Sequence, residues 1–487
     1  MRKINYSYVI LIFILLSSLI LNVRTNLSLP TIPSYDSYYF LETSKDLIEK
    51  EEIPFKTPNT YIDTPINYPS SFPLLISIFS IFSGIGLDEI YKFMGPISFL
   101  FLLTCCFVFL KRYTGDIFVS IIGTILLGSI PYNLYRSTMP LPEIFVLSVV
   151  TLILFLFSFN KKYNIILISI LLAGGVYLHY RSLLIPLIII FLFYGTGNIK
   201  SINKKNLLIF GSKIFFVGVL TVLLILPIFS NVLDQYIFYI SGKQAEWRDI
   251  EFVKARYILP TFLDYEKNLN IFPIFLGIFG FFYLIKNGMN NKINLILIIM
   301  LIFTFVLTQS LRFGFYAPPY RFYSFLSIFL IPLCAIGLRR ISSIEKNSIK
   351  IVTMVLIFFV LSINFVNANL NKTTFVGIYP SDLVAANKLN SLNEEFIVIS
   401  YGGFSIHTGV KNSEGRYDLI YNLFSKNSKI EFDNFLKENY PRDRSIYIFI
   451  IKSMHQPMIE NNPIIEDILK NYDLFFRESG TVIYKVR

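Results

Sequence analysis

The sequence predicts an α-helical polytopic membrane protein with about 11 transmembrane helices and a small extracytosolic α/β domain at its C-terminal end. Of the 487 residues, 54% are hydrophobic and only 16% are charged, whereas soluble globular chains average about 25% charged residues. The apolar residues form long runs separated by short basic connectors, and the last part of the chain carries strand and helix patterns instead. This composition excludes a soluble enzyme, a disordered chain and a disulfide scaffold.

The first apolar run, Tyr6 to Val23, follows Arg2 and Lys3, and no small-residue cleavage site comes after it. We therefore expect a membrane anchor with its N-terminus in the cytosol, not a removed signal peptide. Ten further spans are expected, at roughly residues 91–110, 117–131, 143–159, 163–178, 182–195, 207–230, 272–286, 293–311, 320–338 and 350–366.

The charges of the connectors fix the expected orientation. With the N-terminus in the cytosol, the cytosolic segments hold 15 basic and 2 acidic residues. This is the positive-inside pattern. It predicts a multi-pass protein of the cell membrane whose C-terminal domain is extracytosolic. Because the basic residues are explained in this way, the net charge of +12 predicts no nucleic-acid partner.

The apolar run from Phe72 to Gly84 is too short to cross a bilayer, which needs about 20 residues. If it did cross, every later basic connector would face outward. We therefore expect a helix that lies in the outer membrane interface.

Two domains are expected. Residues 1–366 form the transmembrane domain, which includes a first extracytosolic loop, 24–90, with interfacial helices. Residues 367–487 form the extracytosolic α/β domain, which alternates helical patterns with β-rich runs at 396–400, 445–451 and 481–486.

Four arginines lie at the expected outer ends of helices, where the positive-inside rule predicts few cations: Arg136, Arg181, Arg312 and Arg321. One alone is explained by a side chain that reaches toward lipid phosphates. Together they predict an anion site, because the planar guanidinium group donates two parallel hydrogen bonds to a phosphate.

Three carboxylates and a histidine lie on the same side. Each has a structural interpretation: Asp36 as a helix cap, Asp63 as a turn residue before proline, and Glu143 as a partner of a helix dipole. His179 is interpreted as a hydrogen-bonding residue at a helix end. The same four side chains are also the candidates for chemistry beside the arginines.

The arrangement resembles the GT-C superfamily of membrane glycosyltransferases, including the dolichyl-phosphate mannosyltransferases and the oligosaccharyltransferases. The segment from Tyr35 to Leu41 resembles the family's Asp-x-x-Tyr-Tyr motif, and the segment from Asn67 to Gly84 its interfacial helix. Arg136 to Glu143 lies where many members carry a second acidic position, and Arg312 to Gly337 resembles a late Tyr-Arg-Phe stretch. The resemblance covers roughly residues 1–340. Two departures are clear: Asp36 is followed by serine instead of glutamate, and the Trp-Trp-Asp-Tyr-Gly motif of oligosaccharyltransferases is missing.

The resemblance implies a glycosyltransferase that moves a sugar from a polyprenyl-phosphate or polyprenyl-diphosphate donor to a glycan, lipid or protein acceptor outside the cytosol. Asp36 would be the general base, and Arg181, Arg312, Arg321 and Arg136 would bind the donor phosphate. Glu143, Asp63 and His179 are candidates for binding the acceptor or a divalent cation such as Mg or Mn. Some relatives use a metal and others do not, so the metal requirement stays open.

A polymerase, or a carrier or flippase, of lipid-linked glycans is the alternative. A carrier should place ionisable residues inside the membrane and often has repeated halves, and the sequence has neither feature. A structural or sensory protein that presents the C-terminal domain would leave the acidic first loop and the outer arginines without a purpose.

Overall fold

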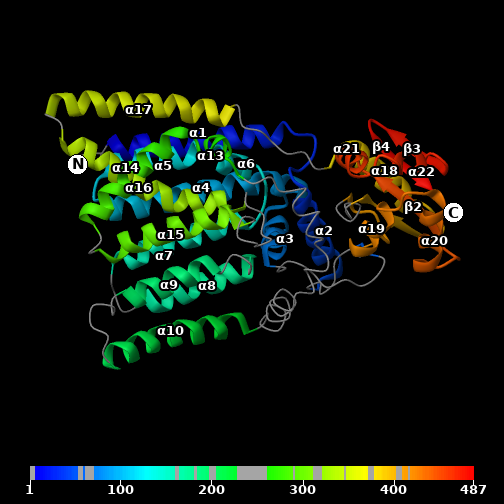
Figure 1. Ribbon diagram of the computed structural model, residues 1–487, viewed down its shortest axis with the longest axis horizontal. Coiled ribbons are helices and arrows are strands. Elements are labelled where there is room, and N and C mark those ends of the chain that lie inside the picture. The colour runs from blue at the N-terminus through cyan, green and yellow to red at the C-terminus, as the bar shows by residue number, and fades with distance from the viewer. Residues whose placement is uncertain are drawn as a thin grey trace. The chain divides into compact units, whose positions relative to one another are not determined.

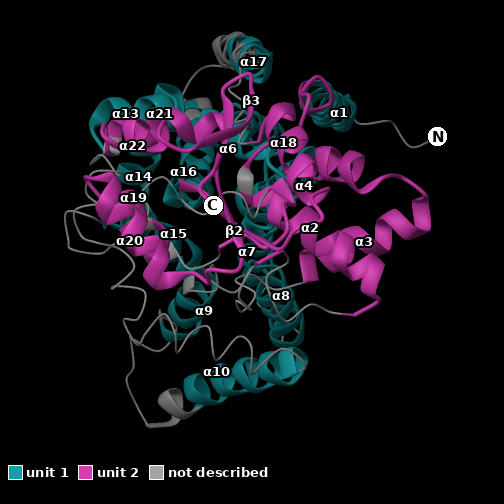
Figure 2. Ribbon diagram, turned by 90° about the vertical axis from the view of Figure 1, so that its right-hand side faces the viewer, with its two compact units in different colours: residues 1–24, 95–373 teal, residues 25–94, 374–487 magenta. Residues whose placement is uncertain are grey.

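The computed structural model describes residues 6–52, 59–60, 71–159, 164–179, 184–196, 204–226, 260–288, 291–310, 321–344, 347–370, 378–401, 408–414 and 417–487. The chain divides into two compact units, coloured separately in Figure 2. The helical unit comprises residues 1–24 and 95–373. The mixed unit comprises residues 25–94 and 374–487, so the segment after the first helix belongs to the same compact unit as the C-terminal segment.

The helical unit is built from long apolar helices, most of which run side by side in Figure 1. Within the described residues, each of the predicted apolar runs overlaps a helix. The helices that lie wholly or partly in this unit are α1 (Tyr6–Leu27), α4 (Leu87–Thr114), α5 (Ile117–Gly128), α6 (Pro131–Ser137), α7 (Glu143–Phe157), α8 (Asn164–His179), α9 (Leu184–Thr196), α10 (Lys204–Ile225), α13 (Phe262–Leu269), α14 (Ile271–Asn287), α15 (Lys292–Thr308), α16 (Phe322–Ile344) and α17 (Asn347–Leu370).

Not all of these helices are long enough to cross a membrane alone. Within the described residues, three are sufficiently long and apolar: Tyr6–Leu27, Leu87–Thr114 and Phe322–Ile341. Two pairs, α5 with α6 and α13 with α14, are bent by 69° and 103° and bring the number to five if each pair is one span. The other apolar helices contribute apolar stretches of 10–17 residues, among them Ile209–Ile225 in α10 and Phe358–Leu370 in α17. The count of about 11 crossings therefore stays a prediction.

Helices α14 and α16 pack unusually closely, and glycines allow it. A Cβ atom added at Gly280 would lie 2.0 Å from the Leu333 carbonyl oxygen, and one added at Gly337 would lie 2.8 Å from that of Leu276. Small residues at such contacts are the usual means by which membrane helices approach each other, since lipid offers no hydrophobic driving force.

A buried polar network joins α1, α6 and α17. The Asn22 amide donates to the Ser18 carbonyl oxygen at 2.7 Å and to Asn369 Oδ1 at 3.1 Å, and Asn22 Oδ1 accepts from the Ser137 hydroxyl at 2.7 Å. The Asn369 amide in turn donates to the Phe365 carbonyl oxygen. Asn22, Ser137 and Asn369 are fully buried. The network thus fixes the position of the short helix α6.

We expect Asn22→Ala to destabilise the protein by about 1–2 kcal/mol, because it removes the amide that donates to Asn369 Oδ1 in an apolar interior. The measurement is the melting temperature in detergent. Ser18→Ala is the matched control, since Ser18 contributes mainly its carbonyl oxygen. Equal melting temperatures for the two variants would contradict this account of the network.

The mixed unit combines helices with one sheet. Its helices are α2 (Tyr35–Lys50), α3 (Ser71–Ser83), α18 (Pro380–Asn390), α19 (Tyr417–Phe424), α20 (Lys429–Asn439), α21 (Lys452–Asn461) and α22 (Ile465–Leu469), together with the start of α4. The strands β1 (Phe396–Ile399), β2 (Ser445–Ile450), β3 (Asp473–Glu478) and β4 (Thr481–Lys485) form a sheet in the order β1-β2-β4-β3. Strands β1 and β2 are parallel, and the other two pairs are antiparallel.

Three of the four strands lie where the sequence predicts them, and β3 is missed. Strand β3 is an edge strand that is partly exposed along its whole length, so it lacks the apolar run that marks β1 and β2. The turn that joins it to β4 does carry a signal. Ser479 and Gly480 both have positive φ, as the favoured two-residue hairpin turn requires.

The segment after α1 and the C-terminal segment are connected by hydrogen bonds. The Thr31 hydroxyl donates to the Ile378 carbonyl oxygen at 2.7 Å, and the Ser413 amide donates to the Asn59 carbonyl oxygen at 2.9 Å. Asn59 also donates from its side chain to Glu42 on α2 at 3.2 Å. These bonds hold the segment that carries Asp36 against the β-sheet segment within one unit.

The start of α18 carries a buried carboxylate in the mixed unit. Asp382 is fully buried and accepts from the Thr481 hydroxyl at 2.6 Å, the Tyr379 amide at 2.8 Å and the Lys452 amide at 3.0 Å. Burial nevertheless raises the pKa of Asp382 above its ordinary value. The folded state therefore binds this proton more tightly than the unfolded state does.

The stabilisation of the folded state by protonated Asp382 is fully present below the pKa of this group in the unfolded chain, about 3.9. It is lost as the pH rises through the higher pKa of Asp382 in the folded protein. We expect the resistance of residues 378–487 to limited proteolysis in the full chain, relative to that of Asp382→Asn, to fall as the pH rises above 4. The ratio of the two cleavage rates removes the pH dependence of the protease. A constant ratio would contradict the assignment.

Candidate functional site

The chain bends by 69° between α5 and α6, and a short turn follows before the start of α7. Pro131 is the first residue of α6, where its fixed φ suits a helix start. Pro140 and Pro142 then separate α6 from α7 and leave Glu143 as the first residue of α7. A carboxylate at this position is favoured by the helix dipole. The turn thus presents Arg136, in the last turn of α6, beside the start of α7.

Three of the predicted site residues meet here. Arg136 Nη2 forms an ion pair with Glu143 Oε2, and His179 Nε2, at the end of α8, lies 3.9 Å from Glu143 Oε1. The side chains are 14%, 21% and 5% exposed, respectively. The sequence places Arg136 in an arginine group for phosphate, whereas in the structure its guanidinium already has a carboxylate partner. This pairing of residues seven apart, across the turn between α6 and α7, is not evident from the sequence.

Asp36 is the second residue of α2 in the mixed unit. The N-cap position of this helix is Ser34, whose side chain makes no capping hydrogen bond. Asp36 is partly exposed, and it has no hydrogen-bond or ion-pair partner among the residues that the structure describes. The carboxylate is therefore accessible to a substrate.

Helix α2 packs against α3 and the start of α4 through residues that follow Asp36. The Phe72 ring of α3 packs edge-on against Phe40 at 5.4 Å between ring centroids and against Tyr91 at 6.3 Å. The Ser44 hydroxyl forms a hydrogen bond with the Tyr91 hydroxyl at 2.8 Å. The other face of α3 exposes apolar side chains, with Ile81 65% and Phe82 87% exposed. Such a face suits the membrane interface that the sequence predicts for this helix.

The backbone just before Asp36 is strained. Ser34 has φ 74° and ψ 144°, a conformation that a side chain disfavours, and it is buried. We expect Ser34→Gly to be more stable than the control variant Ser34→Ala by about 1 kcal/mol, since only glycine removes the strain. Melting temperatures in detergent test this. An alanine variant as stable as the glycine variant would show that Ser34 is not strained.

Of the four other predicted site residues, Arg321 lies in the described part of the chain. Arg321 immediately precedes α16 and is partly exposed. Arg181, Arg312 and Asp63 lie outside the described residues, as do Asn67 to Pro69. Among the described residues, no group of three or more His, Cys, Asp or Glu side chains is arranged to hold a metal ion.

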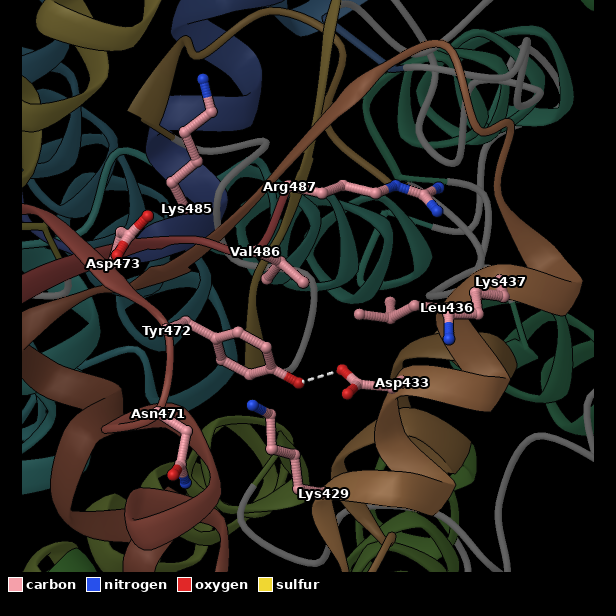
Figure 3. Close-up of a pocket in the computed structure, with 10 residues that line it drawn as sticks. All are labelled: Lys429, Asp433, Leu436, Lys437, Asn471, Tyr472, Asp473, Lys485, Val486 and Arg487. Carbon is pink, nitrogen blue, oxygen red and sulfur yellow. Dashed lines mark hydrogen bonds between the residues drawn. The ribbon is translucent and has the colours of Figure 1, made fainter.

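A cavity of about 320 Å³ lies in the mixed unit between α20, the start of β3 and the end of β4. Figure 3 shows its lining, in which the Tyr472 hydroxyl donates to Asp433 Oδ1 at 2.5 Å. Burial, with Asp433 beside it, raises the pKa of Tyr472. Lys485 donates to Glu394 at 3.0 Å, and Arg487 donates to the Pro441 carbonyl oxygen at 2.5 Å. Because most of these charged groups bind within the chain, this cavity has a structural explanation.

Sequence comparison finds no relative: no protein-family model and no curated protein matches the chain. Solved structures do match the fold. The apo oligosaccharyltransferase of Archaeoglobus fulgidus matches with a TM-score of 0.69 at 12% identity. The match covers 100% of this chain and 75% of the oligosaccharyltransferase chain. ArnT from Cupriavidus metallidurans bound to undecaprenyl phosphate has a TM-score of 0.60 at 10% identity, covering 99% and 97%. The mycobacterial arabinofuranosyltransferase AftD has a TM-score of 0.52 at 13% identity, covering 98% and 40%.

These matches define the class of fold. All three structures are GT-C glycosyltransferases, and the match extends over essentially the whole of this chain. The predicted resemblance to the GT-C superfamily is therefore confirmed at the level of the fold. Identities of 10–13% show the fold alone.

Proposed function

We propose that this protein is a membrane glycosyltransferase that moves a sugar from a polyprenyl-phosphate or polyprenyl-diphosphate donor to an acceptor on the extracytosolic side. The observation that carries the proposal is the GT-C fold of the whole chain. Two structures with this fold contain such lipids: the archaeal oligosaccharyltransferase AglB with a dolichol-phosphate, and ArnT with undecaprenyl phosphate.

Asp36 is the proposed general base. An acceptor hydroxyl attacks the anomeric carbon of the donor sugar, the bond from that carbon to the phosphate oxygen breaks, and the hydroxyl proton passes to the Asp36 carboxylate. The partial exposure of Asp36 and its lack of a partner among the described residues support this role, because a base that is already paired would first have to release its partner.

The leaving polyprenyl phosphate needs cations in place before the bond breaks. Arg181, Arg312 and Arg321 are the proposed donors of hydrogen bonds to it. Arg136 is proposed to act mainly through Glu143, because these two side chains form an ion pair. Glu143 and His179 then remain as candidates for binding the acceptor, and no step of this mechanism is assigned to a metal ion.

Incubation of purified protein with a panel of radiolabelled polyprenyl-phosphate sugars tests the proposal. The panel contains glucose, mannose, galactose and arabinofuranose donors, each with lipid, glycan and peptide acceptors. We expect one donor to be consumed and its label to appear in a new product. Binding of several donors without consumption of any of them would contradict a transferase and favour a carrier.

A further inference from the structure

Four elements of the helical unit meet at a buried polar cluster: α6, α13, the end of α15 and the start of α16. The Tyr323 ring lies 5.7 Å from Tyr132 and 5.4 Å from Tyr265, measured between centroids. Tyr323, Tyr132 and Tyr265 are 3%, 6% and 9% exposed. Gln309 is hydrogen-bonded to Tyr265, and Asn133, the residue after Tyr132, is hydrogen-bonded to Ser327 on α16. We refer to these residues together as the cluster.

Hydrogen bonds fix the orientation of the Gln309 amide. The Thr308 hydroxyl donates to the Phe305 carbonyl oxygen at 2.6 Å, so it must accept from the hydroxyl of Tyr265, with which it is hydrogen-bonded. The Tyr265 oxygen in turn accepts from Gln309 Nε2 at 2.6 Å. Gln309 Nε2 also faces the Pro260 carbonyl oxygen, which can only accept, at 3.4 Å. The Gln309 carbonyl oxygen is therefore the atom left over.

The same reasoning fixes the Asn133 amide. The Ser327 hydroxyl donates to the Ser324 carbonyl oxygen at 2.6 Å and accepts from Asn133 Nδ2 at 2.9 Å. Asn133 Oδ1 is consequently the free end of the side chain. Asn133 is only 2% exposed.

Asn133 Oδ1, Gln309 Oε1 and the Tyr323 hydroxyl are buried and have no hydrogen-bond partner in the described part of the chain. Buried polar groups are almost always paired, because an unmade hydrogen bond is costly away from water. Two of the three are amide oxygens, which can only accept, and the third can donate or accept. The missing partner must therefore offer hydrogen-bond donors.

This requirement distinguishes between the two polar parts of the proposed donor. An ionised phosphate offers only acceptors and would be repelled by amide oxygens, whereas a sugar offers several hydroxyl donors. Arg321, a proposed phosphate ligand, comes two residues before Tyr323. The phosphate and the sugar of the donor are covalently linked. A phosphate ligand and a sugar ligand are therefore expected near each other, as Arg321 and Tyr323 are along the chain.

We propose that Asn133, Gln309 and Tyr323 form the subsite that binds hydroxyl groups of the transferred sugar. This inference rests on the proposed function and specifies its substrate. The subsite recognises a sugar with free hydroxyls carried on a lipid phosphate. Tyr323, Asn133 and Gln309 would then bind the sugar, in addition to Asp36, which takes the proton, and the arginines, which bind the phosphate.

Paired binding measurements test the subsite. The probes are undecaprenyl phosphate and its glucose, mannose and galactose derivatives, with purified full-length protein in detergent. We expect the wild type to bind at least one sugar derivative about tenfold more tightly than the sugar-free lipid. Tyr323→Phe, which keeps the ring and removes only the hydroxyl, should lower this preference about five- to tenfold and leave the affinity for undecaprenyl phosphate unchanged.

Tyr113→Phe is the matched control, because it removes a tyrosine hydroxyl of the same unit that already donates to Asn294 Oδ1 at 2.6 Å. It should leave the sugar preference intact. An equal loss of affinity for both kinds of lipid in Tyr323→Phe, or no loss at all, would overturn the subsite and assign the three atoms to packing or to bound water. A wild type that binds undecaprenyl phosphate without any sugar preference would also overturn it while leaving the proposed function standing. A wild type that binds none of these lipids would overturn both.

Discussion

Asp36→Asn is expected to reduce glycosyl transfer by about 10²- to 10⁴-fold, the range in which a general base contributes, while the Kd for the donor stays within about twofold of the wild type. The amide keeps the size of the carboxylate and its place in the first turn of α2, but it cannot take the acceptor proton. Turnover and donor binding are measured on the same purified variant, so a chemical defect is separated from a binding defect.

Asp46→Asn supplies the control, since Asp46 is a carboxylate of the same helix that binds Lys50 at 2.8 Å. It should transfer sugar at the wild-type rate. If Asp36→Asn retains more than half of the activity, or if donor binding and turnover fall together, then Asp36 is not the base.

Arg136→Ala should destabilise the protein by about 1–3 kcal/mol, the cost of leaving one charged member of a partly buried ion pair unpaired. Glu143 is only 21% exposed, so water cannot fully replace the guanidinium group. The second change, Glu143→Gln, should restore much of this stability in the double variant, because the uncompensated charge is gone. Melting temperatures of the wild type, both single variants and the double variant give the coupling free energy between Arg136 and Glu143.

The same four proteins also separate two roles of Arg136. If Arg136 acts through Glu143, the double variant binds undecaprenyl phosphate as the wild type does. If Arg136 itself contacts the phosphate, stability returns in the double variant but lipid affinity does not. The exposed Arg112, replaced by alanine, should change stability by less than about 0.5 kcal/mol. A similar loss in both arginine variants would contradict the importance of the ion pair.

The long apolar helices were predictable because each is an apolar run bounded by charge, proline or glycine. The start of α5, where the Asp116 side chain accepts from two backbone amides, shows such a boundary. What the sequence could not predict are pairings between residues far apart: Asn22 with Asn369, or Gln309 with Tyr265. Periodicity reports which face of a helix is apolar, but it does not report which neighbour that face meets.

The candidate site was predictable in part for the same reason. Arg136, Glu143 and His179 were each singled out as polar residues at helix ends, and the structure brings these three together. Their mutual pairing was not foreseen, and neither were the roles of Gln309 and Tyr265. The sequence did contain one signal for Gln309, an uncharged polar side chain at the end of a long apolar run. Burial of such a side chain costs free energy unless it forms hydrogen bonds.

The release of polyprenyl phosphate tests the central claim most directly. Purified protein is incubated with the donor that it consumes, and both the transferred sugar and the remaining lipid are quantified by mass spectrometry. The proposed reaction predicts one molecule of sugar-free lipid phosphate, or diphosphate, for each sugar that reaches an acceptor, and almost none with Asp36→Asn. A carrier or flippase would leave the bond between sugar and phosphate intact, and recovery of only the unchanged donor would contradict the account.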